Sequence, residues 1–360
     1  MHRRDRRTRG RNTSVNHRAH GAAYTIAENA SLRTRNSFGV EARAALLVEV
    51  RRTEALAELM AFARFRTQAP LVLGAGSNIL FTRDWPGVVL SLDTRGIELL
   101  DDDGEHLQLR VAAGERWHDF VLWSLAKGCR GLENLALIPG TVGAAPIQNI
   151  GAYGVEVAEF IVAVEAWDRD AGRLVTLTAA QCAFGYRDSL FKREQERWIV
   201  VAVRFALPRQ RALRTDYAGV GEELAAMGVH DAGAAQVAEA VMRLRTRKLP
   251  DPAVLGNAGS FFKNPLLAAD AARTLCARHP GLPCWPDPQG RAKLSAAWLV
   301  EQAGCKGLRE GDAAVSQQHA LVLVNHGNAS GAQLWALAER VRTAVQARFG
   351  VVLEPEPRIV

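Results

Sequence analysis

Hydrophobic positions in the first half of the chain recur at spacings that predict short strands separated by helices. The apolar run over 44–50 predicts a strand, and Thr53 is expected to cap the helix that follows, because the next apolar residues lie at helical spacing: Leu56, Leu59, Met60 and Ala63. Strands are also expected at 71–73, 79–81, 88–92 and 107–112. A second helix ends at Gly128 and carries Trp117, Phe120, Val121 and Leu125. This half of the chain is therefore expected to be α+β.

The second half continues the pattern and contains the clearest domain boundary. Strands are expected near 161–168, 173–177 and 198–205. The helix around Val241 ends at Lys248-Leu249-Pro250-Asp251-Pro252, where two prolines prevent its continuation. We expect a last domain beyond this point, with a serine-led helix at 295–302, a strand at 320–325 and a long helix through Leu334, Leu337, Val341 and Val345.

Composition narrows the class of protein. A chain of 360 residues is too long for one ordinary core, so two or three domains are expected, and 48% hydrophobic with 23% charged residues is typical of a soluble globular protein. No apolar stretch is long enough for a membrane span. The five cysteines include no Cys-x-x-Cys pair, and the nine histidines do not cluster, so we expect a cytoplasmic protein without a structural metal.

The net charge of +7 comes almost entirely from the N-terminal segment. Residues 1–20 contain seven arginines against one acid, Asp5, which leaves about +1 for the remainder. This segment has no apolar core, so it is not a secretory signal, and residues 1–29 are interpreted as a disordered basic leader. Nucleic acid is therefore not expected as a partner. If the leader did bind nucleic acid, the affinity would be lost on deleting residues 1–20 and would fall steeply with salt.

Two glycine-bearing loops are candidate ligand-binding segments. The glycine loop, Gly74-Ala75-Gly76-Ser77-Asn78, follows a predicted strand, and consecutive N–H groups in such a loop can bind an anion. Because Ile79 follows it where a dinucleotide fingerprint would continue into a helix, any dinucleotide is not expected to bind in the Rossmann manner, and a tight hairpin is an equal alternative. The long loop, 138–154, is nearly uncharged and suits close packing along a flat ligand, although a structural crossover is also open.

Three further segments hold side chains with candidate chemistry. Arg187, in Gly185-Tyr186-Arg187-Asp188-Ser189, could grip a carboxylate, although a structural Arg–Asp pair is favoured for this segment alone. Ser260 lacks the Gly-x-Ser-x-Gly setting of a nucleophile, which leaves a proton donor or a turn residue. Glu356, between Pro355 and Pro357, could act as an acid or orient a substrate, but an exposed position on an edge strand is the commoner outcome.

Taken together, these segments resemble the UDP-N-acetylenolpyruvoylglucosamine reductases, the MurB family, in the longer type I form. The similarity runs from about Leu32 to Ile359. Its markers, in order, are 36–39, 74–78, 131–135, 138–154, 185–189, 248–252, 256–265 and 353–358.

The resemblance implies an α+β fold with a two-part FAD-binding module of the vanillyl-alcohol-oxidase type and a C-terminal α+β substrate-binding domain. By analogy, the first FAD-binding subdomain comprises 30–95 and 346–360, the second comprises 96–247, and the substrate-binding domain comprises 248–345. A flavin oxidase with the same module is the nearest rival. Many such oxidases tether their flavin through His or Cys, and neither residue type occurs in the glycine loop or the long loop.

The resemblance also implies an activity. The family binds FAD noncovalently, takes NADPH as reductant and reduces the enolpyruvyl group of UDP-N-acetylglucosamine enolpyruvate to UDP-N-acetylmuramate, a peptidoglycan precursor. Hydride would pass from flavin N5 to C3, Arg187 would stabilise the transient enolate, and Ser260 would give a proton to C2. Glu356 resembles the family's catalytic glutamate and would need a proton or a hydrogen bond to assist rather than repel the anion. A monomer is expected.

The remaining expected contacts follow from the matching family positions. Cofactor contacts are expected from the glycine loop (Gly74, Ala75, Gly76, Ser77, Asn78) and from Pro139, Gly140, Gly143, Ile147 and Asn149. Substrate or NADPH contacts are expected from Tyr153, Lys248 and Asn264. Tyr217 is the nearest candidate for the tyrosine that covers the substrate diphosphate in type I relatives, although its loop departs from the family pattern because the glycine and the acid are shifted.

Overall fold

In the computed structural model, residues 23–217, 219–287 and 289–360 are described. Most of the expected leader, residues 1–22, lies outside them. Its last part is corrected by the structure, because strand β1 (Tyr24–Ser31) begins inside the segment 1–29. All residues of β1 except Asn29 pair with the following strand, so this part of the segment belongs to the folded chain.

A small mixed sheet forms first. Its strand order is β1-β2-β5-β3, with bounds β2 (Arg43–Val50), β3 (Leu71–Leu73) and β5 (Trp85–Leu92). β1 is antiparallel to β2, whereas β2, β5 and β3 are parallel, so helices α1 (Ala55–Ala61) and α2 (Ala63–Thr67) carry the chain from β2 back to β3. The predicted cap at Thr53 is wrong: Glu54 precedes α1, and no side chain caps this helix end.

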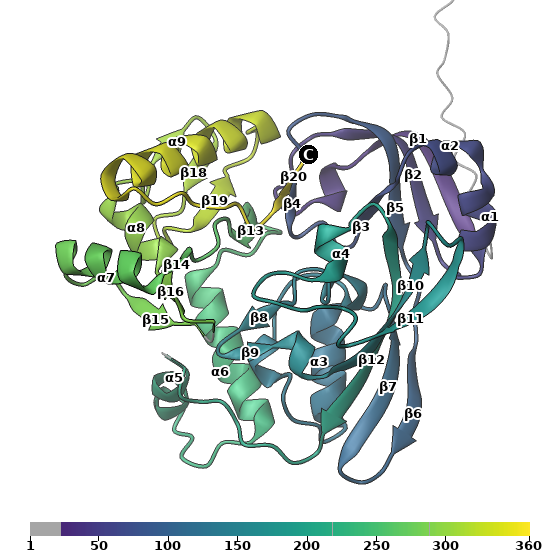
Figure 1. The fold of residues 1–360 in the computed structure, drawn as a ribbon, viewed down its shortest axis with the longest axis horizontal. Helices are drawn as coiled ribbons and strands as arrows, with labels where there is room; N and C mark the ends of the chain where they lie inside the picture. The colour runs from purple at the N-terminus through teal and green to yellow at the C-terminus, as the bar shows by residue number, and fades with distance from the viewer. Residues whose placement is uncertain (1–22, 218, 288) are drawn as a thin grey trace, which may run out of the picture.

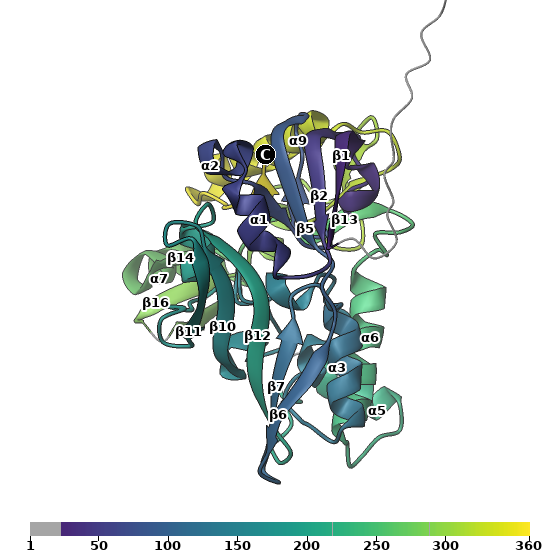
Figure 2. The same cartoon turned by 90° about the vertical axis from the view of Figure 1, so that its right-hand side faces the viewer.

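A larger antiparallel sheet follows in the order β11-β10-β12-β7-β6. The bounds are β6 (Ile97–Asp102), β7 (His106–Ala112), β10 (Ile161–Asp168), β11 (Arg173–Thr178) and β12 (Trp198–Pro208). Helices α3 (Trp117–Ala126) and α6 (Ala234–Lys248) share its hydrophobic core and lie beside β7 in Figure 2. Short elements complete this region: β8 (Gly151–Ala152), β9 (Val155–Glu156), α4 (Leu190–Arg193) and α5 (Val220–Ala226).

The last part of the chain forms two further sheets covered by helices, coloured green to yellow in Figure 1. One has the order β13-β19-β18-β17, with bounds β13 (Gly256–Ser260), β17 (Arg309–Glu310), β18 (Ala313–Val315) and β19 (Val322–Asn325). The other comprises β14 (Leu266–Ala268), β16 (Arg291–Leu294) and β15 (Cys284–Pro286). The helices are α7 (Ala269–Arg278), α8 (Ala296–Gln302) and α9 (Gly331–Phe349). The predicted serine-led helix is confirmed, since Ser295 Oγ accepts from Trp298 N at 3.2 Å.

The chain end returns to the first sheet region. Strand β20 (Arg358–Ile359) pairs in parallel with β4 (Ile79–Leu80), directly after the glycine loop. A continuous hydrophobic core also joins the N-terminal and C-terminal parts, with Phe38 and Phe81 packed in the same cluster as Phe261 and Leu334. These contacts bring Glu356, near the end of the chain, beside Asn78.

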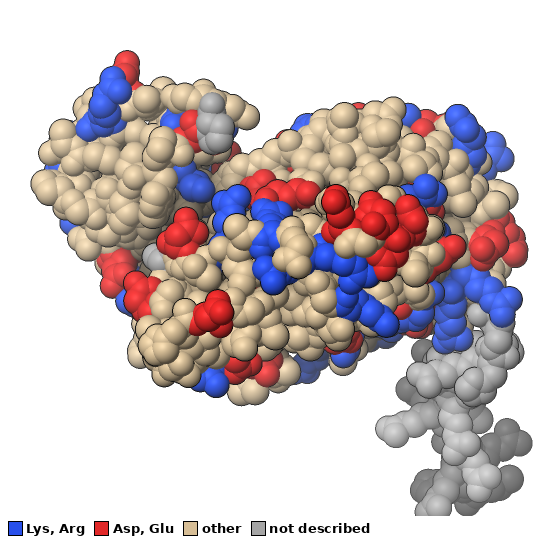
Figure 3. All heavy atoms as spheres, turned by 90° about the horizontal axis from the view of Figure 1, so that it is seen from below, with Lys and Arg blue, Asp and Glu red and all other residues tan. Residues whose placement is uncertain are grey.

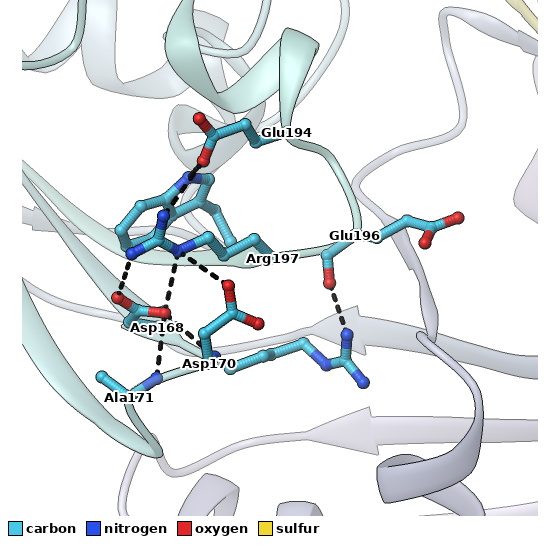
Figure 4. A network of polar contacts seen from close by, with 8 residues as sticks. Asp168, Asp170, Ala171, Glu194, Glu196 and Arg197 are labelled. Atoms are coloured by element: carbon cyan, nitrogen blue, oxygen red, sulfur yellow. Dashed lines mark hydrogen bonds and ion pairs between the residues drawn. The ribbon is translucent and has the colours of Figure 1, made fainter.

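A polar network fixes the turn between β10 and β11 (Figure 4). Asp168 accepts backbone hydrogen bonds from Asp170 N (3.0 Å) and Ala171 N (3.2 Å), and Arg197 Nη2 donates to its Oδ2 at 2.8 Å. The hydrogen bond from Arg197 lowers the pKa of Asp168. The Arg197 guanidinium lies 4.4 Å from the ring centroid of Trp198, so the same side chain ties the turn to the start of β12.

The surface charge, the helices and the potential metal ligands bear on the expectations from the sequence. Figure 3 shows basic and acidic side chains interspersed on the face drawn. No helix in the described ranges is long and apolar enough to cross a bilayer, and no cluster of potential metal ligands occurs within them. The five cysteines are free thiols.

Candidate active site

The glycine loop has the geometry of an anion-binding segment. The prediction that a strand rather than a helix follows this loop is confirmed, because β4 begins at Ile79. Gly76 has φ of +66°, and a Cβ there would overlap the carbonyl oxygen of Arg35, so only glycine fits. The N–H groups of Ala75, Gly76 and Ser77 donate to no acceptor among the described residues. Three consecutive free donors on a turn suit a phosphate group.

The long loop packs against the glycine loop. Ser77 Oγ donates to Pro139 O at 3.1 Å, and a Cβ on Gly74 would lie 2.9 Å from Thr141 Oγ1. Gly143 approaches the second sheet closely, with its N–H donating to Ala113 O at 2.9 Å and no space for a Cβ. The loop contains only short elements, as expected from its glycines and prolines. The two loops together line the junction between the first and second sheets.

Asn149 has a structural role that the sequence did not suggest. Its side chain is buried, its Nδ2 donates to Glu156 Oε2 (2.7 Å) and Gly185 O (3.1 Å), and its Oδ1 accepts from Ala158 N (3.0 Å). Ile147 is also fixed, because its carbonyl oxygen accepts from Ser189 Oγ at 2.6 Å. Any cofactor contact of Asn149 would therefore be made through its backbone.

Arg187 meets Glu356 across the two halves of the chain. Arg187 Nε lies 3.0 Å from Glu356 Oε1 without the alignment of a hydrogen bond, so the contact is an ion pair, and Arg187 Nη2 donates to Gly151 O at 2.8 Å. Arg187 has φ of +53°, a strained conformation for an arginine. The neighbouring acid Asp188 pairs with Arg193 instead. The structural Arg187–Asp188 alternative is therefore excluded.

Backbone contacts place Glu356 beside the Ser260 segment. Glu356 N donates to Phe261 O at 2.8 Å, and Lys263 N donates to Glu354 O at 3.0 Å. Glu354 is exposed and pairs with Lys263, whereas the Glu356 side chain is only 14% exposed. The exposed position considered for Glu356 is therefore not found.

Ser260 is the last residue of β13, and the next residue, Phe261, accepts the backbone hydrogen bond of Glu356. It is half-buried, and its hydroxyl has no hydrogen-bond partner within residues 23–217, 219–287 and 289–360. A hydroxyl without a protein partner is free to approach a bound molecule. The structure therefore brings Arg187, Glu356 and the Ser260 segment into one region.

Two tyrosines pack together at the end of the long loop. The rings of Tyr153 and Tyr217 are edge-to-face with centroids 5.6 Å apart, and Tyr217 is 51% exposed. Burial raises the pKa of Tyr153. Tyr153 has φ of +48°, and Asn134 Nδ2 donates to its carbonyl at 3.0 Å, which fixes this end of the loop. Tyr217, the candidate for the tyrosine that covers the substrate diphosphate, thus lies against another predicted substrate residue.

The other two predicted substrate contacts differ in their surroundings. Lys248 ends α6 and is exposed. Asn264 is half-buried, and its Oδ1 accepts from Ala296 N at 2.9 Å at the start of α8. The amide nitrogen of Asn264 has no partner among the described residues, so it is available for a ligand.

Several polar residues of this region were missed at the level of sequence. Gln148 Nε2 donates to Glu356 Oε1 at 3.3 Å, and Lys192 Nζ donates to Arg187 O at 3.0 Å. Burial, then the charge of Lys263, lowers the pKa of Lys192. Arg245, whose Nε donates to Leu137 O at 3.3 Å, has its pKa lowered by burial. Gln148 lies between two residues that were predicted, so its position in the long loop was the available signal.

Two cavities in the described part of the chain lie outside the group formed by Arg187, Ser260 and Glu356, and the first of them touches the glycine loop at Ala75. One, of about 400 Å³, is bordered by Ser37, Ala75 and Pro252, and the other, of about 590 Å³, by Met60, Phe65 and Trp167. Neither is lined by Arg187, Ser260 or Glu356. The candidate site is thus defined by converging side chains rather than by either cavity.

Two protein-family models match the chain. The FAD binding domain matches residues 44–178, which include the glycine loop and the long loop. The C-terminal domain of UDP-N-acetylenolpyruvoylglucosamine reductase matches residues 251–360, which include Ser260 and Glu356.

Known proteins resemble the chain over nearly its whole length. A UDP-N-acetylenolpyruvoylglucosamine reductase of Xanthomonas euvesicatoria pv. vesicatoria is 55% identical over 338 residues, 94% of this chain and 97% of the relative. One from Xanthomonas campestris pv. campestris is 54% identical with the same coverage. The crystal structure of the reductase MurB from Thermus caldophilus superposes with a TM-score of 0.63 at 27% identity, covering 93% of this chain and 98% of that one.

Proposed function

The chain belongs to the UDP-N-acetylenolpyruvoylglucosamine reductase (MurB) family, and we propose that it reduces the enolpyruvyl group of UDP-N-acetylglucosamine enolpyruvate to UDP-N-acetylmuramate with NADPH as reductant. The observation that carries the proposal is the meeting of Arg187, Glu356 and the Ser260 segment at one place. These residues come from distant parts of the chain, and each is of the type that an enolpyruvyl reduction requires.

The flavin fits the two loops that border the site. The free N–H groups of Ala75, Gly76 and Ser77 would hold the FAD diphosphate, and the uncharged long loop would pack along the flat ring system. When bound, FAD supplies the hydride that adds to C3 of the enolpyruvyl group. No histidine or cysteine occurs in either loop, so a noncovalent cofactor is expected.

Arg187 would bind the substrate carboxylate and stabilise the enolate. Hydride addition at C3 moves negative charge through C2 into the carboxylate, and a fixed guanidinium lowers the free energy of that state. The ion pair with Glu356 and the bond to Gly151 O already orient the side chain. Less reorganisation is then needed when the substrate binds.

Ser260 would give the proton to C2. Its free hydroxyl and its position beside the Phe261–Glu356 contact support this role. A serine is a weak acid, so the proton transfer would depend on the developing carbanion and on positive charge such as that of Arg187, which Glu356 links to the Ser260 segment. Glu356 would need to carry a proton or accept hydrogen bonds in the reacting complex, because a bare carboxylate there would repel the enolate.

The outer part of the substrate would contact the predicted polar residues. The packed rings of Tyr153 and Tyr217 at one end of the long loop would contact the substrate. Lys248 and Asn264 are the other candidate contacts. We also propose the domain division inferred from the sequence, with β20 returning the chain to the first FAD-binding subdomain. A monomer remains our proposal for the assembly.

An anaerobic half-reaction experiment tests this function. We expect a yellow protein whose flavin is bleached by NADPH and recoloured by UDP-N-acetylglucosamine enolpyruvate but not by simple alcohols. A colourless protein that cannot be reconstituted with FAD would refute the proposal. Oxidation of an alcohol or sugar by the oxidised flavin would instead support the rival class of flavin oxidases.

A further inference from the structure

We propose that Gln148 is a positioning residue that determines which carboxyl oxygen of Glu356 faces the substrate with its proton. This inference rests on the proposed function and goes beyond it, because it assigns a role to a residue that touches neither end of the proposed proton transfer. It follows from a chain of hydrogen bonds that joins the glycine loop to Glu356.

Three contacts form this chain. Asn78 Nδ2 donates to Gln148 Oε1 at 2.8 Å, and the same nitrogen donates to the backbone oxygen of Glu356 at 3.2 Å. Gln148 Nε2 then donates to Glu356 Oε1 at 3.3 Å. All three side chains are half-buried, so each contact is partly shielded from water.

The donor and acceptor directions of these hydrogen bonds are set by Asn78. A backbone carbonyl accepts hydrogen bonds and never donates them, so the atom of Asn78 that faces Glu356 O must be the amide nitrogen. That nitrogen also faces Gln148, which must therefore present its carbonyl oxygen to Asn78. The amide nitrogen of Gln148 is then left to face Glu356. The Gln148 side chain thus has only one orientation that satisfies its neighbours.

This orientation makes Glu356 Oε1 an acceptor. Oε1 receives the Gln148 N–H and lies 3.0 Å from Arg187 Nε, so a proton placed there would face two donors. Oε2 has no donor against it in the described part of the chain. A proton taken up by Glu356 would therefore be carried by Oε2. The hydrogen bond from Gln148 keeps Oε1 beside Gln148 and leaves Oε2 as the other oxygen.

Other charges near Glu356 do not select between its two oxygens in this way. Lys192 and the Tyr186 hydroxyl interact electrostatically with Glu356, but neither donates a hydrogen bond to it. Lys263 is paired with Glu354. Gln148 and Arg187 are the two groups that contact Oε1, and of these only Gln148 is an uncharged donor whose orientation is fixed by the glycine loop.

Two substitutions separate positioning from packing. Gln148→Met keeps the length of the side chain and removes the donor. Gln148→Glu keeps the shape, removes the donor when the introduced carboxyl group is ionised, and restores a donor when that group is protonated. An ordinary glutamic acid has a pKa of about 4.3. Because the introduced carboxyl group faces another acid, its pKa should be higher than that value. Gln195→Glu, at an exposed site, is the matched charge control.

The readout is the anaerobic rate of each half-reaction between about pH 5 and 8, a range that brackets the expected titration. We expect Gln148→Met to slow flavin reoxidation by the enolpyruvyl substrate about 100-fold at every pH, with reduction by NADPH within about threefold of wild type. Gln148→Glu should be equally slow at pH 8 and should recover toward the wild-type rate as the pH falls. Gln195→Glu should behave as wild type.

Retained FAD and an unchanged melting temperature show that the variants are folded. Equal slowing of both half-reactions, or a Gln148→Glu variant that does not recover at low pH while folded, would overturn the positioning role. If Gln148→Met does not fold, the pH-dependent recovery of Gln148→Glu decides the question. Failure of the proposed function is distinguishable, because the wild-type protein itself would then not be recoloured by the enolpyruvyl substrate.

Discussion

Replacement of Arg187 by lysine isolates the contribution of its planar guanidinium. In the wild-type protein, Arg187 Nη2 lies 2.8 Å from Gly151 O and Nε lies 3.0 Å from Glu356 Oε1. Lysine keeps the positive charge, but its single ammonium group cannot reproduce both contacts in the geometry of the planar guanidinium. The substrate carboxylate would therefore lose a donor that is fixed in place. Loss of one such preoriented donor costs about 2.7–4 kcal/mol in the transition state, or about 100- to 1,000-fold in rate.

The assay for Arg187→Lys is the single-turnover reoxidation of the reduced flavin, followed by absorbance under anaerobic conditions. We expect reoxidation by the enolpyruvyl substrate to slow by about 100- to 1,000-fold. The melting temperature should change little, because the charge that faces Glu356 is kept. The reasoning would be refuted if Arg187→Lys were reoxidised at the wild-type rate while remaining folded and loaded with FAD.

Three further predictions address the proton donor, the cofactor loop and stability. Ser260→Ala should leave bleaching by NADPH nearly intact and slow substrate reoxidation by orders of magnitude, and equal damage to both steps would show a structural role instead. Gly76→Ala forces a Cβ against Arg35 O at positive φ. It should cost more stability than the about 1–3 kcal/mol of the backbone strain alone and should weaken FAD retention, measured by thermal melting and flavin content. Although burial opposes it, the hydrogen bonds from Arg110 (2.9 Å) and Arg204 (2.7 Å) lower the pKa of Glu165. The ionised Glu165 thus stabilises the fold fully above about pH 4.3, and this stabilisation is lost as the pH falls through the lower pKa of the folded state. Glu165→Gln should therefore lower the melting temperature at pH 7 and have a vanishing effect in acid. A constant difference in melting temperature at all pH values would contradict an origin in the ionised carboxylate.

Periodic segments of the fold were predictable from the sequence. β10 matches its predicted bounds, and α6 and α9 contain the apolar residues that predicted them. β6 was not predicted, because it is an edge strand with Leu99 and Leu100 exposed among acidic residues, so no hydrophobic alternation marks it. The start of β1 was included in the leader, which was assigned from its basic composition, and β1 itself has no buried position.

The candidate site shows where sequence reasoning ends. The sequence marks Arg187, Ser260 and Glu356 as candidates, but it does not show which acid pairs with Arg187. The adjacent Asp188 pairs with Arg193, and Glu356 near the chain end pairs with Arg187. Such a pairing depends on β20 joining β4, a contact between distant segments. Asn149 was expected at the cofactor from its matching family position, and the sequence did not show that its side chain makes three hydrogen bonds that hold the loop itself.

Turnover in D₂O with NADPH and UDP-N-acetylglucosamine enolpyruvate tests the proposed reaction most directly. The Ser260 hydroxyl exchanges its proton with solvent, so UDP-N-acetylmuramate formed by the wild-type protein should carry deuterium at C2. Mass spectrometry and NMR of the product locate the label. Absence of the reduced product, or a product without deuterium at C2, would contradict the account.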